Sequence, residues 1–238
     1  MGAGVSAEAV IWHDLECGGY RADLRLWRRL ARDHGGPVLD IGSGTGRVAL
    51  VLARAGHHVI AVESDHDLAA ELARRAGALP VTVRCADACA FELASPVPLC
   101  IVPMQTLHLL EDRAAFLRCA RAALRPGGVL AVALLGSGVE PFELELDADA
   151  VLIDGVRYES APTGLRRSDG TVLLERRRSR VGAGPTRSEI DRVSLRECSV
   201  PELIADAAAA GFELAGVHQV APTREHAGSA VVCLGVPG

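Results

Sequence analysis

The chain has 238 residues, of which 49% are hydrophobic, and its formal net charge is −5. This length suits one large α/β domain, or one domain with an inserted lobe, better than two independent domains. All 25 basic residues are Arg, and the only dense basic run lies within residues 175–180, so we expect no nucleic-acid partner. A small-molecule ligand fits this composition better, with the protein a monomer or homodimer.

The cysteine pattern predicts a reducing compartment. Seven cysteines lie mostly inside apolar segments and show no paired CxxC spacing. Cys85 and Cys89 lack a nearby histidine or third cysteine, so we expect no metal site. No apolar run reaches the roughly 18 residues of a membrane span, and polar residues between Glu8 and Asp14 disfavour a signal peptide. We therefore expect a cytoplasmic protein without a membrane partner.

The N-terminal segment predicts a helical cover. Residues 5–34 have the apolar spacing of one or two helices, and Gly18 and Gly19 interrupt the run. Trp12 and Trp27 supply apolar surface that such helices can bury. We interpret residues 1–35 as a cover over the part of the chain that follows.

A glycine-rich loop follows this cover, in the sequence VLDIGSGTGR at residues 38–47. The apolar start predicts a buried parallel strand, and Gly42, Gly44 and Gly46 let the backbone turn sharply and approach a ligand closely. The next residues have helical spacing that ends at Gly56, so the loop leads to a helix N-terminus. Strand, loop and helix together predict a nucleotide pocket.

The spacing of the glycines indicates which nucleotide this pocket takes. The dinucleotide fingerprint is GxGxxG, whereas this chain has GxGxG with Asp40 two residues before it. A carboxylate at the strand end would repel a pyrophosphate and suits a cation, such as the ammonium group of an amino acid. A ligand that combines an ammonium group with a ribose therefore fits better than a dinucleotide.

The rest of the first half alternates between strands and helices, which predicts a parallel sheet. Strands are expected at 57–63, 81–87, 98–104 and 129–135, and helices at 64–77 and 108–124.

The pattern changes after residue 140. Residues 141–199 give short alternating runs with turn signals at Asp154-Gly155 and Asp169-Gly170, which predict a small antiparallel lobe. Residues 200–238 add a helix at 201–212 and two runs that predict a hairpin on the sheet edge. We therefore divide the single domain, residues 1–238, into the cover, a cofactor-binding core at 36–140, the inserted lobe and this final segment.

The acid followed by GxGxG at the end of the first strand resembles the motif of class I S-adenosylmethionine-dependent methyltransferases. The order of elements resembles this family from about residue 36 to 135 and again from 201 to the end, while the lobe has no specific match. The resemblance implies an α/β fold: a Rossmann-like, doubly wound, mostly parallel seven-stranded sheet with an antiparallel last strand. The small antiparallel β lobe is then an insertion after the fifth strand. The implied cofactor is S-adenosyl-L-methionine, and S-adenosyl-L-homocysteine is the product.

Acids at two later strand ends agree with this cofactor. Glu63 follows Asp40 by 23 residues, the spacing at which an α/β nucleotide fold presents an acid to the ribose hydroxyls. Asp87 ends the third predicted strand, where the resemblance implies an acid that accepts from the adenine amine; a simple helix cap is the alternative. The expected cofactor-binding residues are Tyr20, Asp40, Gly42, Ser43, Gly44, Gly46, Glu63, Ser64, Asp87, Ala88, Pro103 and Met104.

Methyl transfer depends mainly on positioning, because the sulfonium is already activated. The fourth strand lacks the acid often found near its start and has no NPPY-type sequence, but its end still lies over the sulfonium by topology. Gln105 could orient a substrate there, and His108 could take a proton from a hydroxyl or amine. A packed or capping histidine is the alternative for His108, and core packing is the alternative for Tyr20.

The sequence therefore predicts an enzyme that transfers a methyl group from S-adenosylmethionine to an O, N or C nucleophile of a small molecule. A non-catalytic protein that binds or senses the same cofactor is the first alternative. A nicotinamide-dependent oxidoreductase is the second, and the glycine spacing disfavours it.

Overall fold

The computed structural model describes residues 3–136, 141, 147–223 and 228–238. It divides the chain into two compact units, one drawn from residues 1–19 and 139–197 and the other from residues 20–138 and 198–238. The predicted cover is thus shared between the units. The beginning of the predicted lobe, residues 142–146, lies outside the described residues. Within the described ranges, none of the helices combines the length and hydropathy of a membrane-spanning helix.

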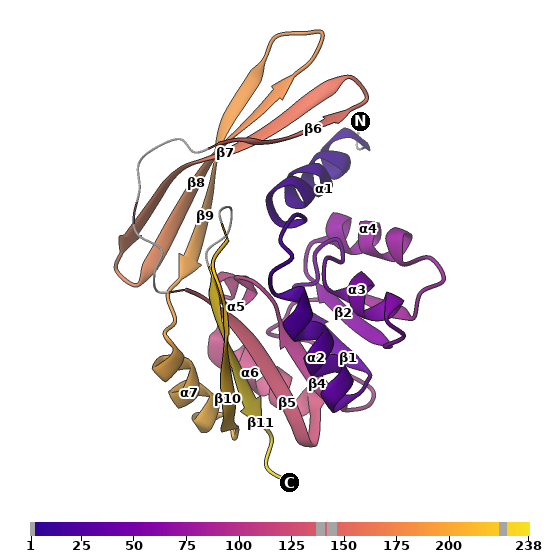
Figure 1. Cartoon of the computed structure of the whole chain (residues 1–238), viewed down its shortest axis with the longest axis vertical. Helices are drawn as coiled ribbons and strands as arrows, with labels where there is room; N and C mark the ends of the chain where they lie inside the picture. The colour runs from indigo at the N-terminus through magenta and orange to yellow at the C-terminus, as the bar shows by residue number, and fades with distance from the viewer. Residues whose placement is uncertain (1–2, 137–140, 142–146, 224–227) are drawn as a thin grey trace. The chain divides into compact units, whose positions relative to one another are not determined.

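The larger unit contains a seven-stranded sheet in the order β10-β11-β5-β4-β1-β2-β3 (Figure 1). Strand β11 runs antiparallel to both of its neighbours, whereas β5, β4, β1, β2 and β3 pair in parallel. This arrangement confirms the predicted fold class. The strands are β1 (Val38–Ile41), β2 (Val59–Glu63), β3 (Val81–Cys85), β4 (Val97–Val102), β5 (Leu124–Leu135), β10 (Glu213–Val220) and β11 (Ser229–Gly235).

Helices cover both faces of this sheet, since its central strands are apolar on both sides. Neighbouring residues of β1 show this, because Leu39 belongs to one buried cluster and Val38 to the other. Trp27 of α2 joins the cluster of Val38, and Phe116 of α6 joins that of Leu39. The helices are α2 (Leu24–His34), α3 (Ala49–Arg54), α4 (His66–Ala76), α5 (Thr106–Leu109), α6 (Arg113–Ala123) and α7 (Val200–Ala209).

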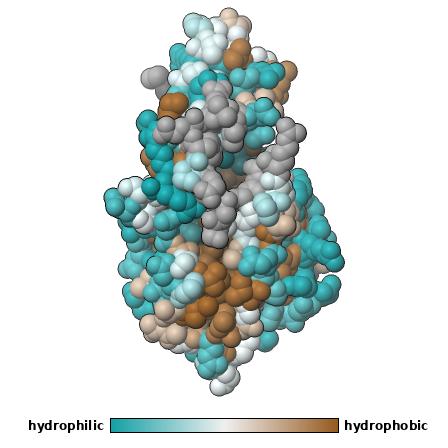
Figure 2. Space-filling model, turned by 60° about the vertical axis from the view of Figure 1, so that its left-hand side comes forward, coloured by the Kyte–Doolittle hydropathy of each residue, from teal (hydrophilic) through white to brown (hydrophobic). Residues whose placement is uncertain are grey.

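The edge strand β10 exposes two large apolar side chains. Leu214 and Val217 of the edge strand β10 are 51% and 40% exposed. Figure 2 shows a continuous brown area in the lower half of the view, with hydrophilic surface on its right-hand side.

The predicted single helix at 108–124 is two helices, α5 and α6. The break occurs because Asp112 caps α6, where its Oδ1 accepts a hydrogen bond from the Ala115 N–H at 2.8 Å. Four strands also differ in their bounds from the prediction. Strand β2 begins at Val59 and β3 ends at Cys85, while β4 spans Val97–Val102 and β5 already begins at Leu124.

The smaller unit consists of helix α1 (Ala3–Cys17) and a four-stranded antiparallel sheet in the order β6-β7-β8-β9. Asp154 and Asp169 have φ of 49° and 50°, followed by glycines with positive φ, so both predicted turns are confirmed. Between the two turns the chain forms one strand, with an irregularity in its pairing between Pro162 and Gly164. The strands are β6 (Asp149–Ile153), β7 (Val156–Ser168), β8 (Thr171–Val181) and β9 (Arg187–Arg196).

Two arginines of the run on β8 pair with acids of this unit. Arg178 donates to Glu16 of α1 at 2.7 Å and to Asp191 of β9 at 2.9 Å. Arg180 pairs with Glu8 of α1 at 2.5 Å. Arg178 and Arg180 therefore join helix α1 to the sheet.

Replacing the cap of α6 tests the break between the two helices. We expect Asp112→Ala to lower the free energy of unfolding by about 1 kcal/mol, because the first turn of α6 loses its acceptor. Asp112→Ser retains an acceptor and should stay within a few tenths of a kcal/mol of the wild type. Urea unfolding followed by circular dichroism measures both; equal losses in the two variants would contradict the capping role.

Candidate functional site

The glycine loop lies at the carboxyl end of β1 and folds back onto β2. The N–H groups of Gly42 and Ser43 both donate to the Val62 carbonyl, at 2.9 and 3.2 Å. Gly42 has a φ of +66°, and a Cβ there would lie 2.4 Å from Cγ2 of Thr106. The first glycine is therefore required both by its backbone conformation and by close packing against the start of α5.

The third glycine brings the loop against the two helices that follow. Gly46 has a φ of +100°, and a Cβ on it would lie 2.4 Å from Cδ1 of Leu72 and 2.8 Å from Cγ of Leu50. The chain then enters α3 at Ala49, two residues later than the predicted helix start at Arg47.

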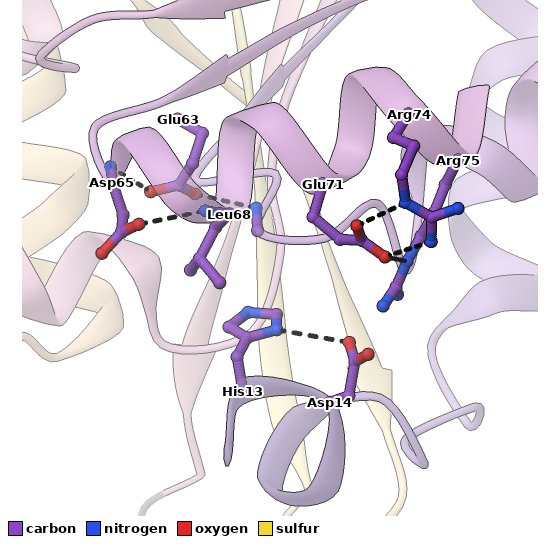
Figure 3. Close-up of polar contacts among 9 residues, drawn as sticks. His13, Asp14, Glu63, Asp65, Leu68, Glu71, Arg74 and Arg75 are labelled. Carbon is purple, nitrogen blue, oxygen red and sulfur yellow. Dashed lines mark hydrogen bonds and ion pairs between the residues drawn. The ribbon is translucent and has the colours of Figure 1, made fainter. Parts of the chain in front are cut away.

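Glu63 holds the glycine loop against the turn after β2 (Figure 3). Its Oε2 accepts from the Gly44 N–H at 2.8 Å, and its Oε1 accepts from the Asp65 N–H at 3.0 Å. The residue is 9% exposed. A carboxylate has about four lone-pair sites, so two N–H donors leave room for two hydroxyl donors.

Asp40 is a buried carboxylate within the same loop region. The residue is 1% exposed, and neither oxygen makes a hydrogen bond of ordinary geometry with the described residues. Burial raises the pKa of Asp40 from 3.8 to about 7; the charge of Arg47 opposes this rise and the charge of Glu63 adds to it. Such a carboxylate favours a cationic ligand, because a nearby positive charge stabilises its ionised form.

Arg47 connects the glycine loop to the start of α2. Its Nη1 and Nη2 each donate to one oxygen of Asp23 at 2.7 Å, and Trp27 Nε1 donates to the same carboxylate at 2.8 Å. The side chains of Arg47 and Asp23 are 7% and 2% exposed. We did not predict this pair from the sequence, although a lone Arg directly after the glycine motif, in an apolar context, is a signal for it.

Tyr20 belongs to the same cluster. Its carbonyl accepts from Arg47 Nη1 at 2.9 Å, and the Arg47 guanidinium lies 5.1 Å from the centre of its ring. Burial, together with the charge of Asp23, raises the pKa of the Tyr20 phenol. The structure thus brings Tyr20 together with the residue that follows Gly46.

The segment after β3 lies next to the end of β2, because the Ala86 N–H donates to the Glu63 carbonyl at 2.9 Å. Asp87 is exposed, and its Oδ1 accepts from the Cys89 N–H at 2.8 Å, while Ala88 is buried. Ser64 is exposed, and Asp65 instead caps α4 by accepting from Asp67 and Leu68.

The end of β4 leads into an unusual backbone conformation. Met104 has a φ of 55°, which is uncommon for a residue with a side chain, and it lies between the buried Pro103 and the half-buried Gln105. His108 is 3% exposed, and its Nε2 accepts from the Leu135 N–H at 2.9 Å. Because Nε2 is an acceptor, the neutral ring carries its proton on Nδ1.

Comparison with known families agrees with this geometry. Residues 38–128, from β1 into β5, match a family model described as a methyltransferase domain. This stretch, 91 of the 238 residues, therefore resembles a methyltransferase domain. No curated protein matches the chain.

Solved structures of methyltransferases resemble this chain over more than nine tenths of its length. The CcbJ methyltransferase of Streptomyces caelestis is 24% identical, covering 91% of this chain and 96% of its own, with a TM-score of 0.69. The sugar N-methyltransferase KedS8 of Streptoalloteichus is 20% identical, covering 97% and 93%, with a TM-score of 0.79. CalS10 of Micromonospora echinaspora, an amino pentose methyltransferase solved with S-adenosylmethionine, is 21% identical, covering 94% and 96%, with a TM-score of 0.74.

Removing one side of the buried ion pair tests its role in the methyltransferase domain. We expect Arg47→Met to lower the free energy of unfolding by about 3–5 kcal/mol, because Asp23 stays buried without its cation. Adding Asp23→Asn to this variant should recover part of the loss, since the amide still accepts from Trp27 without a charge. Urea unfolding of both variants measures the effect, and no recovery in the double variant would contradict a buried charge as its cause.

The pKa of Asp40 predicts a pH dependence. The pKa of Asp40 is about 7 in the folded protein, whereas its ordinary value is 3.8. Between these two pH values the folded chain therefore retains a proton that the unfolded chain has lost. The contribution of Asp40 to stability is therefore fully present below about pH 4 and is lost as the pH rises towards 7. Relative to Asp40→Asn, the wild type should lose about 2–3 kcal/mol between about pH 5 and pH 8. Urea unfolding at these two pH values checks this, and parallel pH profiles would contradict the raised pKa.

Proposed function

We propose that the chain methylates an amine nitrogen of a small, sugar-containing molecule. The observation that carries this proposal is the likeness to KedS8, a sugar N-methyltransferase, which extends over 97% of this chain and so includes the antiparallel sheet as well as the methyltransferase domain. CalS10 and the glycopeptide N-methyltransferase MtfA support the same acceptor class.

The proposed cofactor roles follow from the contacts in the loop region. Glu63 would accept from the ribose hydroxyls with the lone pairs that its two N–H donors leave. The buried Asp40 would attract the ammonium group of the methionine part. The positive charge of that group would in turn lower the pKa of Asp40. S-adenosylmethionine, when bound, supplies a methyl group on an activated sulfonium.

The remaining predicted cofactor residues keep their proposed roles. Asp87 and Ala88 would face the adenine, with Ser64 beside them. Tyr20 would close over the methionine part from the start of the larger unit. Ser43 lies inside the glycine loop, and Pro103 and Met104 would face the sulfonium from the end of β4.

The acceptor would be positioned by the segment after β4. Gln105 is half-buried and carries both a donor and an acceptor, so it can orient an amine or a neighbouring hydroxyl. His108 remains our proposed general base. Its Nε2 is engaged by the Leu135 N–H, so taking a proton there requires that this bond be released, and the proton would otherwise go to solvent.

We also propose that the protein acts in the cytoplasm as a monomer or homodimer. Among the described residues, Cys85, Cys89, Cys100, Cys119, Cys198 and Cys233 form no disulfide, which suits a reducing compartment.

The function is tested with purified full-length chain, S-adenosylmethionine and a panel of amino sugars and matched hydroxyl sugars. We expect a mass gain of one methyl group on an amino sugar, and S-adenosylhomocysteine as the second product. Glu63→Gln should bind the cofactor about 10–100-fold more weakly in isothermal titration, since it loses charge-assisted bonds. The matched control is Glu92→Gln on an exposed acid, which should bind like the wild type.

Three results would contradict the proposal in different ways. No cofactor binding by the wild type would exclude the methyltransferase, and binding of NADH in its place would favour the oxidoreductase. Tight cofactor binding with no methylated product across the panel would favour a protein that binds the cofactor without catalysis. Methylation of hydroxyl sugars alone would exclude the amine acceptor.

A further inference from the structure

A cavity lies in the larger unit, apart from the residues assigned to the cofactor. Its volume is about 720 Å³, and α2 lines it together with the end of β10 and the residues that follow. This size is in the range of sites for small organic ligands, which is about 300–1,000 Å³. Its described lining residues include none of the proposed cofactor residues.

The wall formed by α2 is strongly basic. Arg25, Arg28, Arg29 and Arg32 all line the cavity, at spacings of three and four residues that place them on one face of the helix. The opposite face of α2 is buried in the sheet through residues such as Trp27. Like charges at this spacing repel one another and destabilise the helix. A bound anion would reduce this repulsion.

The cavity contains no carboxylate to balance these charges among the residues described as its lining. Arg32 pairs with the neighbouring Asp33 at 3.2 Å, and both side chains are largely exposed. Arg29 instead contacts a histidine, with its Nη2 3.2 Å from Nδ1 of His218 on β10. Burial and the charge of Arg29 lower the pKa of His218, so the ring is neutral and can donate its other N–H group.

The rest of the cavity lining is partly apolar. Leu26 of α2, Val220 at the end of β10 and Pro222 after it line the cavity, and Gln219 adds a polar group. A bare inorganic ion would leave these apolar side chains without a contact. A ligand with both an anionic and an organic part would use the whole cavity.

The cavity also lies on the side of the sheet where the parallel strands end, which is the side that carries the cofactor loop. Val220 pairs with Ser229, Ser229 pairs with Leu135, and the Leu135 N–H donates to His108. Two strand spacings, about 10 Å, therefore separate the end of β10 from β5 at this edge.

We propose that this cavity binds a small organic diphosphate through the guanidinium groups of α2. The guanidinium group of Arg presents planar pairs of N–H donors that match phosphate oxygens. It also keeps its positive charge at every physiological pH. The concave shape and the apolar wall favour a small ligand over an extended anionic surface. The site is independent of the methyl acceptor, so its test does not rest on the proposed function.

The test uses the full chain and isothermal titration with uridine diphosphate, whose pyrimidine avoids competition with the adenosyl group of the cofactor. We expect saturable binding of one molecule per chain that weakens as NaCl is raised. Arg25→Gln combined with Arg29→Gln should weaken binding at least about tenfold, since charge-assisted bonds are lost. The same variant should bind S-adenosylhomocysteine like the wild type, which checks that it is folded.

The matched control is Arg118→Gln combined with Arg125→Gln, which removes the same charge from exposed positions outside the cavity. This control should bind uridine diphosphate within about twofold of the wild type, because removing exposed charge outside the cavity has little effect at moderate salt. Equal losses in the two double variants would overturn the proposal in favour of a general charge effect. Absence of saturable binding would also overturn it, as would binding to phosphatidylserine vesicles with the same variant dependence but none to the soluble probe.

Discussion

The buried guanidinium of Arg47 is the interaction on which the loop region depends. It places a positive charge beside two buried acids, since it forms two hydrogen bonds with Asp23 and opposes the raised pKa of Asp40. Without a cation, two carboxylates at this depth would cost several kcal/mol each. The same side chain also binds the carbonyl of Tyr20, so it fixes the start of α2 against the glycine loop. The same guanidinium therefore balances the charge of Asp23 and holds the start of α2 against the glycine loop.

The backbone of the loop is fixed from the other side by β2. The Val62 carbonyl and the Glu63 carboxylate together accept four N–H groups, from Gly42, Ser43, Gly44 and Asp65. A carboxylate in this position stabilises the loop whether or not a ligand is present. The role proposed for Glu63 toward a ribose is thus added to a structural role, and a loss of binding in a Glu63 variant must be read together with its stability.

The arginine side chains of the two units have different surroundings. In the smaller unit, acids on α1 and β9 neutralise Arg178 and Arg180, so an arginine run that looks like a binding surface becomes an internal connection. In the larger unit, the arginines of α2 face a cavity whose described lining has no acid. A run of arginines in a sequence therefore has no fixed meaning, because its partners come from segments far away in the chain. Glu16 and Arg178 are 162 residues apart.

The sequence by itself determined the fold class, the glycine loop and the acids of the first two strand ends, because these depend on local signals: apolar runs, turn residues and fixed spacing. It also determined both aspartate-glycine turns of the smaller unit. The tertiary structure alone decided three features. Asp112 divides a continuous helical pattern into α5 and α6. An aspartate can cap a new helix at this point only because the chain before it leaves the helical conformation. His108 has its Nε2 bound to the backbone of β5, and Arg47 meets Asp23 across 24 residues. Each of these depends on which distant group lies within hydrogen-bonding distance, and periodicity contains no information about that.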